Sequence, residues 1–424
     1  MGWSSSSKAI LAGISGTALQ WYDFAIFGYF APIIASTYFP SDNHIASLLS
    51  VFSVFAVGYV LSPLGSIVFG YIGDHYGRKR ALTLSILAMA IPTAFISVIP
   101  GYASIGIAAP TLITLLRMVQ GLVASAEFTG SAIFLVEHAR SDRKALYGCL
   151  TSSAYSMGLI LAGIAASFFT ASFMPDWGWR IGFAIALIAG SLIFYLRQSV
   201  NETPEYQRIN DHQKPRYPFF VAVKEMPLAI IGVIGIAWLV GIMTFGTYVF
   251  TASYLHSYFH LSLSNATLII TFALVVDAVL EPFIAMFADK FGHLKIIRIG
   301  MISMMLLSIP VFYALSSENM ILITGGLVLM SILIAVTYAP LNAYMVSLFP
   351  HRYRFSGFGV SFNIGISVLG ATTPLVMIWL IDVTGNVIAP AWYYVFGTVM
   401  GLASLVLCEK SRHGADESFE MVMN

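Results

Sequence analysis

The chain has 424 residues, of which 58% carry hydrophobic side chains and only 10% are charged, and its mean hydropathy is +0.83. Ordinary soluble domains are much more polar, so this composition excludes them and predicts a membrane protein. Long apolar runs separated by short polar breaks support the same conclusion.

Twelve of these runs have about the 20 residues that a helix needs to cross a hydrocarbon core of about 30 Å. The sequence therefore predicts an all-α polytopic membrane protein. The first run has Gln20 and Asp23 in its middle and no small-residue cleavage pattern after it, so we expect it to remain as a helix. The expected spans are 9–39, 45–73, 81–99, 107–136, 145–172, 179–197, 227–259, 263–288, 295–315, 320–348, 356–381 and 391–408.

Basic residues lie almost entirely in alternate loops. Of the 21 Lys and Arg residues, only Arg180 falls in the opposite loops, and Arg117 lies within a span. The positive-inside rule then predicts a multi-pass protein of the cytoplasmic (inner) membrane with both termini in the cytoplasm. Cys149 and Cys408 lie in separate spans and imply no disulfide framework, and a monomer would suffice.

A polar stretch near the midpoint, "NETPEYQRINDHQKPRYP", predicts a cytoplasmic linker over 200–226 between six-helix halves at 1–199 and 227–424. The halves share an internal repeat: "GYIGDHYGRKR" at Gly70 recurs as "AMFADKFGHLK" at Ala285. Asp74 and Gly77 are thereby matched by Asp289 and Gly292. Two related halves predict a transporter with its binding site near the bilayer midplane.

The first copy of this repeat resembles the loop motif between helices 2 and 3 of the major facilitator superfamily, through Gly70, Asp74, Gly77, Arg78 and Arg80. Other stretches resemble its metabolite:proton symporter family, which includes proline/betaine, dicarboxylate and shikimate carriers. The resemblance implies the major facilitator fold and proton-coupled uptake of a small polar metabolite by alternating access. These stretches are "WYDF" at Trp21, "RMVQG" at Arg117 running into "EFTGS" at Glu127, "DWGWRIGF" at Asp176, "NETPEY" at Asn201 and, more thinly, "SLFPHRYRFSGFGVSFNIG" from Ser347.

The loop motif also has a physical interpretation. Gly70 allows close helix approach, Asp74 can accept hydrogen bonds from a helix N-terminus, and Arg78 can pair with Glu137 or Asp142. We expect such a cluster, with Asp289 in the repeat, to hold the halves together on the cytoplasmic side in one state and to break in the other. The alternative is a simple positive-inside bias, which explains Lys79 and Arg80 but not the Gly and Asp spacing.

Four acids lie at membrane depth: Asp23, Glu127, and Asp277 with Glu281, which share a helix face at i,i+4. Arg117 is the single cation expected there. Buried ionisable groups cost at least a few kcal/mol unless they face a wet cavity or a partner, so each is a functional candidate. We expect Asp23 and Glu127 to bind the coupling proton. Alternatively, Asp23 only hydrogen-bonds a neighbour or forms an ion pair with Arg117.

Four acids against one base favour a zwitterion or organic cation, such as an amino acid or betaine, over a dicarboxylate. Cation-π contact would hold its ammonium, and Arg117 would meet its carboxylate. Ordinary packing of the aromatic residues, interhelical hydrogen bonds of the amides, a carboxylate symporter and a non-coupled facilitator remain open alternatives. The substrate-binding candidates are Tyr22, Arg117, Gln120, Tyr248, Asp277, Glu281, Asn342, Asn363 and Trp379.

Neither a P-loop nor an HExxH pattern occurs, so we do not expect an enzyme. His75, His293 and His351 lie in expected cytoplasmic loops without metal-ligand spacing and are predicted to be solvated, with no metal site. The expected partners are a small-molecule substrate, a proton as the coupling ion and the lipid bilayer. No other cofactor and no nucleic acid is expected.

Overall fold

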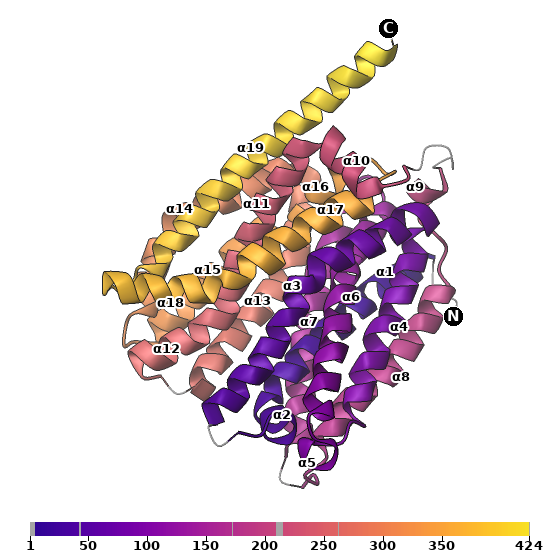
Figure 1. Cartoon of the computed structure of the whole chain (residues 1–424). Helices are drawn as coiled ribbons and strands as arrows, with labels where there is room; N and C mark the ends of the chain where they lie inside the picture. Colours follow the sequence, from indigo (N-terminus) through magenta and orange to yellow (C-terminus); the bar gives the residue numbers. More distant parts are fainter. Residues whose placement is uncertain (1–4, 42–43, 172, 209–214, 262, 424) are drawn as a thin grey trace.

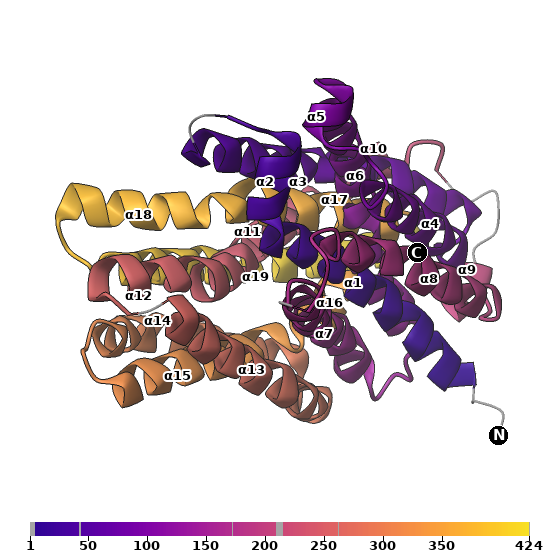
Figure 2. The same ribbon diagram turned by 90° about the horizontal axis from the view of Figure 1, so that it is seen from below.

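The computed structural model describes residues 5–41, 44–171, 173–208, 215–261 and 263–423, and within these ranges all regular structure is helical. Long helices run roughly side by side in one bundle (Figure 1). Helices of the first half of the sequence lie on one side of the bundle, and those of the second half lie on the other (Figures 1 and 2).

The first half contains six long helices and two short ones. Its predicted first span, 9–39, is divided because the long helix α1 ends at Tyr29 and a short helix follows it. The elements are α1 (Ser5–Tyr29), α2 (Ala31–Tyr38), α3 (His44–Tyr76), α4 (Arg78–Ile96), α5 (Tyr102–Ile105), α6 (Ala108–His138), α7 (Lys144–Phe169) and α8 (Trp179–Gln198).

The second half has the same number of spans, but three of them are interrupted. Pro340 separates α15 from α16, because proline has no N–H and its ring clashes with the preceding turn. The elements are α11 (Pro227–Thr244), η2 (Phe245–Phe250), α12 (Thr251–Phe259), α13 (Leu263–Phe291), α14 (His293–Leu315), α15 (Met320–Tyr338), α16 (Leu341–Ser347), α17 (Arg354–Asn363), η3 (Ile364–Leu369), η4 (Gly370–Thr372), α18 (Thr373–Thr384) and α19 (Pro390–Met423).

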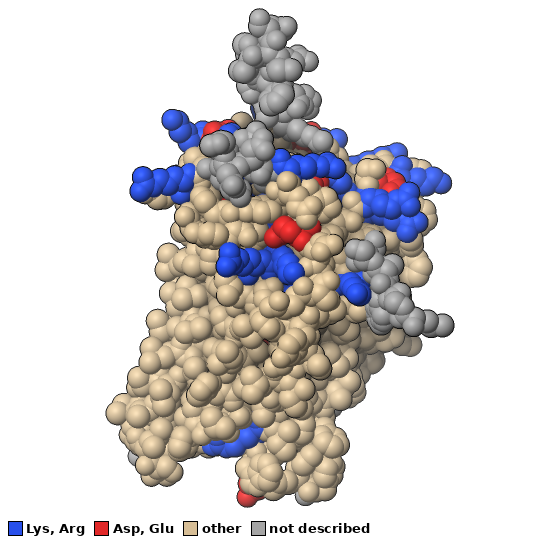
Figure 3. Space-filling model, turned by 90° about the vertical axis from the view of Figure 1, so that its right-hand side faces the viewer, with Lys and Arg blue, Asp and Glu red and all other residues tan. Residues whose placement is uncertain are grey.

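Two short helices, α9 (Pro204–Gln207) and α10 (Pro218–Glu225), connect the halves. They lie at the end of the bundle from which α19 projects (Figure 1). Lys and Arg side chains gather at this same end, which we call the basic end, and on the face that Figure 3 shows a broad band almost without charged side chains separates this end from the opposite one.

Among the described residues, eleven helical segments are long and apolar enough to cross a membrane. α1 is the twelfth long helix and packs against α7, α6 and α8. It carries the polar Gln20 and Asp23, and it is present as a helix, as the sequence predicted. The chain is therefore a multi-pass membrane protein, as its composition predicted.

Candidate functional site

At the basic end, Asp74 joins the two halves. It lies at the end of α3 in the first half, and its carboxylate accepts the N–H groups of Phe355 (3.0 Å) and Ser356 (2.9 Å) in the first turn of α17. Those N–H groups have no partner within their own helix and carry the positive end of the helix dipole. Gly70 lets the helices approach, since a Cβ there would lie 2.8 Å from Ser356 Cα. We call this contact the Asp74 latch.

Arg78 reinforces the Asp74 latch from a fully buried position. Its Nε lies 3.4 Å from Glu137, its Nη1 lies 3.5 Å from Asp74, and its Nη2 donates to the carbonyl of His351 at 2.5 Å. Of the two partners left open by the sequence, Glu137 is therefore the one in contact. Asp142 instead pairs with Arg140 on the surface.

Arg80 lies outside this network although it belongs to the same sequence motif. Its side chain is exposed, with the guanidinium 5.7 Å from the centre of the Tyr76 ring. For Arg80, the positive-inside bias is therefore a sufficient explanation, as the alternative interpretation of the motif had it.

The second copy of the repeat makes the reciprocal contact. Asp289, near the end of α13 in the second half, accepts the N–H groups of Ala145 (2.7 Å) and Leu146 (3.0 Å) in the first turn of α7. We call this contact the Asp289 latch. The matched glycines Gly77 and Gly292 have φ values of 108° and 99°, a conformation that only glycine adopts without strain.

Several residues of the basic-end network were not assigned a role from the sequence. Arg354 of α17 contacts both Glu137 (3.0 Å) and Glu205, so α9 of the linker also joins the two halves. The residues concerned belong to "NETPEY" and "PHRYR", two stretches in which the family resemblance was visible. The family resemblance of these two stretches was the sequence feature that could have marked Arg354 and Glu205 as members of the network.

Two histidines expected to be solvated are instead paired. His351 Nδ1 lies 2.8 Å from Glu205 and 3.9 Å from Glu137, and these two carboxylates raise the pKa of His351. His293 lies 3.1 Å from Asp289. The ligand atoms of Glu137, Glu205 and His351 are close enough together to hold a metal ion, but Arg354 already supplies a cation to both carboxylates.

Deeper in the first half, Asp23 is fully buried in a closed polar network. Its carboxylate accepts from Arg117 Nη1, Thr93 Oγ1 and Gln120 Nε2, each at 2.9 Å. The Arg117 guanidinium lies 4.3 Å from the ring centre of Phe27 and 4.9 Å from that of Phe24. This is the ion pair that the sequence left open as an alternative.

Glu127 forms a second buried ion pair, with Arg197 of α8. Two Arg197 nitrogens lie 2.8 Å from its oxygens, and Ser85 donates to it at 2.5 Å. Arg117 is thus not the single cation at depth, and the expected excess of four acids over one base is wrong. The backbone of Arg197 lies at the end of a span, but its long side chain reaches inward past Gly16. Only glycine leaves room for it there, because a Cβ at position 16 would lie 1.9 Å from Arg197 Nη2.

Asp277 and Glu281 are the buried acids that stay without a cation in the part of the chain that the structure describes. Tyr248 of η2 lies beside Asp277, and Ser152 and Ser153 of α7 lie beside Glu281; their hydroxyls hydrogen-bond Ser331 and the carbonyl of Cys149. The acids at membrane depth that have no cationic partner among the described residues therefore lie on α13.

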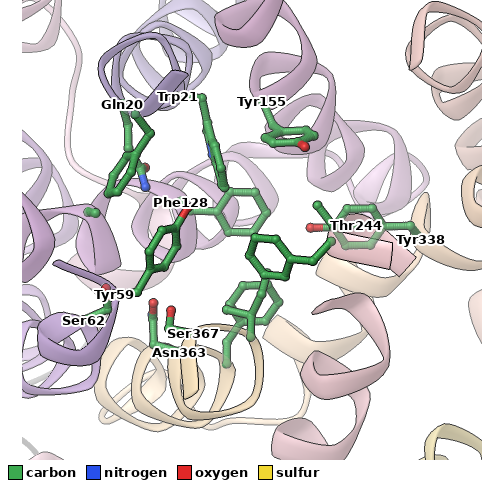
Figure 4. A pocket seen from close by; sticks show the side chains of 15 residues that line it. Gln20, Trp21, Tyr59, Ser62, Phe128, Tyr155, Thr244, Tyr338, Asn363 and Ser367 are labelled. Carbon is green, nitrogen blue, oxygen red and sulfur yellow. The ribbon is translucent and has the colours of Figure 1, made fainter. Parts of the chain in front are cut away.

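A cavity lies between the halves (Figure 4). None of the fifteen described residues that line it is charged, and eight are aromatic. Its volume of about 50 Å³ is below the roughly 150 Å³ that holds a benzene molecule, so rings must move before a metabolite can enter. The lining residues are Gln20, Trp21, Phe24, Tyr59, Ser62, Ala124, Phe128, Tyr155, Thr244, Phe245, Tyr338, Phe362, Asn363, Ile366 and Ser367.

Of the predicted substrate-binding residues, the structure places Asn363 in this cavity. Trp379 is 59% exposed on α18, because its side chain points out of the bundle. Tyr22 faces α8, where its hydroxyl donates to the carbonyl of Gly182. Asn342 donates to the carbonyl of Gly148 across the halves, which is the interhelical bond considered as its alternative.

Arg117 and Gln120 lie behind the cavity wall, since both are engaged with Asp23 and only Phe24 of that neighbourhood faces the cavity. Tyr248, Asp277 and Glu281 lie beyond the opposite wall, near Tyr155 and Tyr338. The expectation that acids and Arg117 directly contact the substrate is therefore not met in this state.

The halves separate away from the basic end. A cleft of about 780 Å³ opens there between α7 and Tyr29 of the first half and α13 and Tyr248 of the second. With both latches made at the basic end, the structure is closed on that side and open on the other.

Two related halves, reciprocal latches and a central cavity together define a membrane transporter fold. Residues 13–365 match the Major Facilitator Superfamily, so the chain belongs to this superfamily, as predicted, and is a transporter rather than an enzyme. It is a secondary active transporter for a small metabolite.

Among its relatives is the "Proline/betaine transporter" of Escherichia coli (strain K12), which is 29% identical over 419 residues, covering 95% of this chain and 83% of the relative. The "Glycine betaine/proline/ectoine/pipecolic acid transporter OusA" of Dickeya dadantii (strain 3937) is 30% identical over 410 residues, covering 93% and 81%. The fold is shared with the proton:xylose symporter XylE bound to 6-bromo-6-deoxy-D-glucose, at a TM-score of 0.76 and 16% identity, covering 96% of this chain and 95% of that one.

Proposed function

We propose that this transporter takes up a zwitterionic metabolite, betaine or proline being the leading candidates, together with protons. The uncharged, aromatic lining of the central cavity is the observation that carries the substrate class. A fixed charge in the lining would favour an ion of opposite sign, whereas aromatic faces attract an ammonium group without demanding a net charge. The relatives that transport proline and betaine support the same class.

Two polar atoms in the lining have no hydrogen-bond partner among the described residues: the indole Nε1 of Trp21 and the amide Oε1 of Gln20. The indole N–H can only donate, so it suits a carboxylate. The rings of Tyr155 and Phe24, whose centres lie 4.4 Å and 6.0 Å from the centre of the Trp21 ring, offer faces for the ammonium end. A zwitterion satisfies both features at once.

Asp23 is the proposed site of the coupling proton. While ionised, it holds Arg117 at 2.9 Å, and the Arg117 guanidinium packs on Phe24, whose ring forms part of the cavity wall. Protonation of Asp23 would release Arg117 and so loosen that wall. Glu127 has a structural role in this proposal, because its contacts with Arg197 and Ser85 join α6 to α8 and α4. Among the described contacts, Arg197 packs on no ring of the cavity wall, unlike Arg117.

The positive-inside rule places the basic end in the cytoplasm, with both termini there. In this orientation the structure is open to the outside, and uptake requires both latches to break after the substrate and proton have bound. The proposed location is the cytoplasmic (inner) membrane.

Uptake of radiolabelled proline and glycine betaine into proteoliposomes with an imposed pH gradient tests the proposal. We expect accumulation above equilibrium that a protonophore abolishes and that Asp23→Asn loses. Equilibration without accumulation would indicate a non-coupled facilitator, and uptake of dicarboxylates instead would exclude the zwitterion class. Coupled accumulation that survives in a variant with both Asp23→Asn and Glu127→Gln would overturn the coupling site.

Trp21→Phe tests the contact with the substrate carboxylate, since it removes the indole N–H and keeps a ring. We expect KM to rise by roughly ten- to a hundredfold, the loss of a hydrogen bond to a charged group being worth about 1.5–3 kcal/mol. Trp379→Phe is the matched control, because that indole is exposed on the outer surface.

A further inference from the structure

The acid pair on α13 has a different environment from the other buried acids of the membrane region. Asp23 and Glu127 each have an arginine at 2.9 Å or less, whereas no described cation faces Asp277 or Glu281. Asp277 is 4% and Glu281 1% exposed, and one oxygen of each, Oδ1 and Oε2, has no hydrogen-bond partner among the described residues. Two neighbouring carboxylates in such surroundings require a compensating positive charge.

The groups around the pair are oxygen donors without charge. Ser152 and Ser153 lie beside Glu281, and Tyr248 lies beside Asp277. The other titratable groups nearby are Cys149 and Tyr155 of α7 and Tyr338 of α15. Of the other helices that pack on α13, α14 carries its basic residues Lys295 and Arg298 at the basic end, and the histidine of α12, His256, is exposed. Carboxylate and hydroxyl oxygens are ligands for small hard cations.

The pair also lies on a route from the open side. Thr267, Ile270, Thr271 and Leu274 of α13 line the cleft between the halves. Residues at i+3, i+4 and i+7 share one helix face, so Asp277 and Glu281 continue this face one and two turns deeper. Tyr248 lines the cleft and also lies beside Asp277, which places the first acid next to the cleft.

We propose that Asp277 and Glu281, with the hydroxyls of Ser152, Ser153 and Tyr248, form a binding site for one small monovalent cation, H⁺ or Na⁺, at the seam between the halves. This site is separate from the Asp23–Arg117 pair and does not depend on which metabolite is carried. Because the serine hydroxyls beside Glu281 belong to α7, a cation bound there touches both halves. The Asp289 latch joins the same two helices, about 12 Å further along α13.

Cation binding by the purified full chain, without any substrate, tests the proposal. Infrared difference spectra between acidic and alkaline pH in Na⁺-free buffer would reveal a protonated carboxyl group. Thermal unfolding in NaCl against choline chloride at equal ionic strength would reveal Na⁺ binding. A carboxyl signal alone identifies the proton as the ligand, and a rise in Tm with Na⁺ identifies sodium.

The variant Asp277→Asn/Glu281→Gln should lose the carboxyl band of this pair, or the rise in Tm with Na⁺, that the wild type shows, while the exposed control Glu318→Gln should keep it. Asp23→Asn should remove only the band of its own carboxyl group. Should the double variant not fold, the single variants Asp277→Asn and Glu281→Gln take its place. The proposal is overturned if the wild type shows neither signal, or if the signal survives in these variants. Since no transport is measured, that failure is distinct from failure of proton-coupled uptake.

Discussion

The two latches share one geometry but differ in the charges behind it. In both, an aspartate near the end of one helix accepts two N–H groups from the first turn of a helix in the other half. Behind Asp74 stands Arg78, fully buried and paired with Glu137. At the corresponding place behind Asp289, 215 residues along, stands His293, a residue that is 27% exposed in its side chain.

This difference shows that the repeat preserves the hydrogen bonds but not the electrostatics. A buried arginine with buried carboxylates is costly to separate, because each partner left alone is an uncompensated charge. A partly exposed histidine next to an aspartate adds little, because solvent screens the pair. The Asp74 latch should therefore dominate the closure of the basic end, and the Asp289 latch should contribute a smaller share.

Glu137→Gln should have the largest effect, since it removes at once the buried carboxylate that Arg78 and Arg354 share and leaves Arg78 with Asp74 and Arg354 with Glu205 alone. We expect the closed state to lose about 3–5 kcal/mol, which corresponds to more than a hundredfold change in the opening equilibrium. Spin labels at Ser141→Cys and Lys295→Cys, both exposed at the basic end, would report a longer distance. The native Cys149 and Cys408 are buried and should stay unlabelled. Asp142→Asn, on the surface, is the control, and an unchanged distance in Glu137→Gln would contradict the network.

Asp74→Asn and Asp289→Asn compare the latches directly. Each loses charge-assisted hydrogen bonds to a helix terminus, and Asp74→Asn also removes a partner of Arg78. We expect the closed state to be destabilised by about 2–3 kcal/mol in Asp74→Asn and by about 1 kcal/mol in Asp289→Asn. Uptake should fall further in Asp74→Asn while its amount in the membrane stays normal. Equal effects would show that Arg78 contributes nothing, and normal uptake by Asp74→Asn would remove its gating role.

His351→Gln should remove a pH dependence from the closed state. The nearby carboxylates of Glu137 and Glu205 raise the pKa of His351, and they stand next to it only while the basic end is closed. Its stabilisation is thus fully present below about pH 6.5 and is lost as pH rises through the raised value. Burial raises the pKa of Glu205, but His351 and Arg354 lower it by more, so Glu205 stays ionised throughout this range. The same spin-label distances report the ratio of closed to open molecules. In the wild type this ratio should fall by up to about fivefold from acidic to alkaline pH. The same fall in His351→Gln would show that this histidine is not the source of the pH dependence.

Arg80→Ala should have the smallest effect, within about 0.5 kcal/mol, because its side chain is exposed and outside the network. Normal uptake and a normal amount in the membrane are expected. A strong loss of uptake would mean that the motif acts through more than the two latches.

The fold was predictable because apolar length and loop charge are properties of the sequence itself. The repeat around Asp74 and Asp289 also predicted contacts with helix termini, since those carboxylates follow a span at a fixed spacing. Arg197 and Arg354 were not predictable in the same way. Both lie at span ends and count as loop residues, and only the packing of α8 and α17 shows that their long side chains reach inward to Glu127 and Glu137. Spacing along one helix does not reveal a partner on another.

The uncharged lining of the central cavity has an energetic consequence for the proposed cycle. A zwitterion crosses without net charge, so the membrane voltage acts on the accompanying cations alone. Each cation contributes about 2.3 kcal/mol per 100 mV, equivalent to a roughly fiftyfold concentration ratio. A second occupied cation site would therefore square the gradient that the cell can sustain at a given voltage.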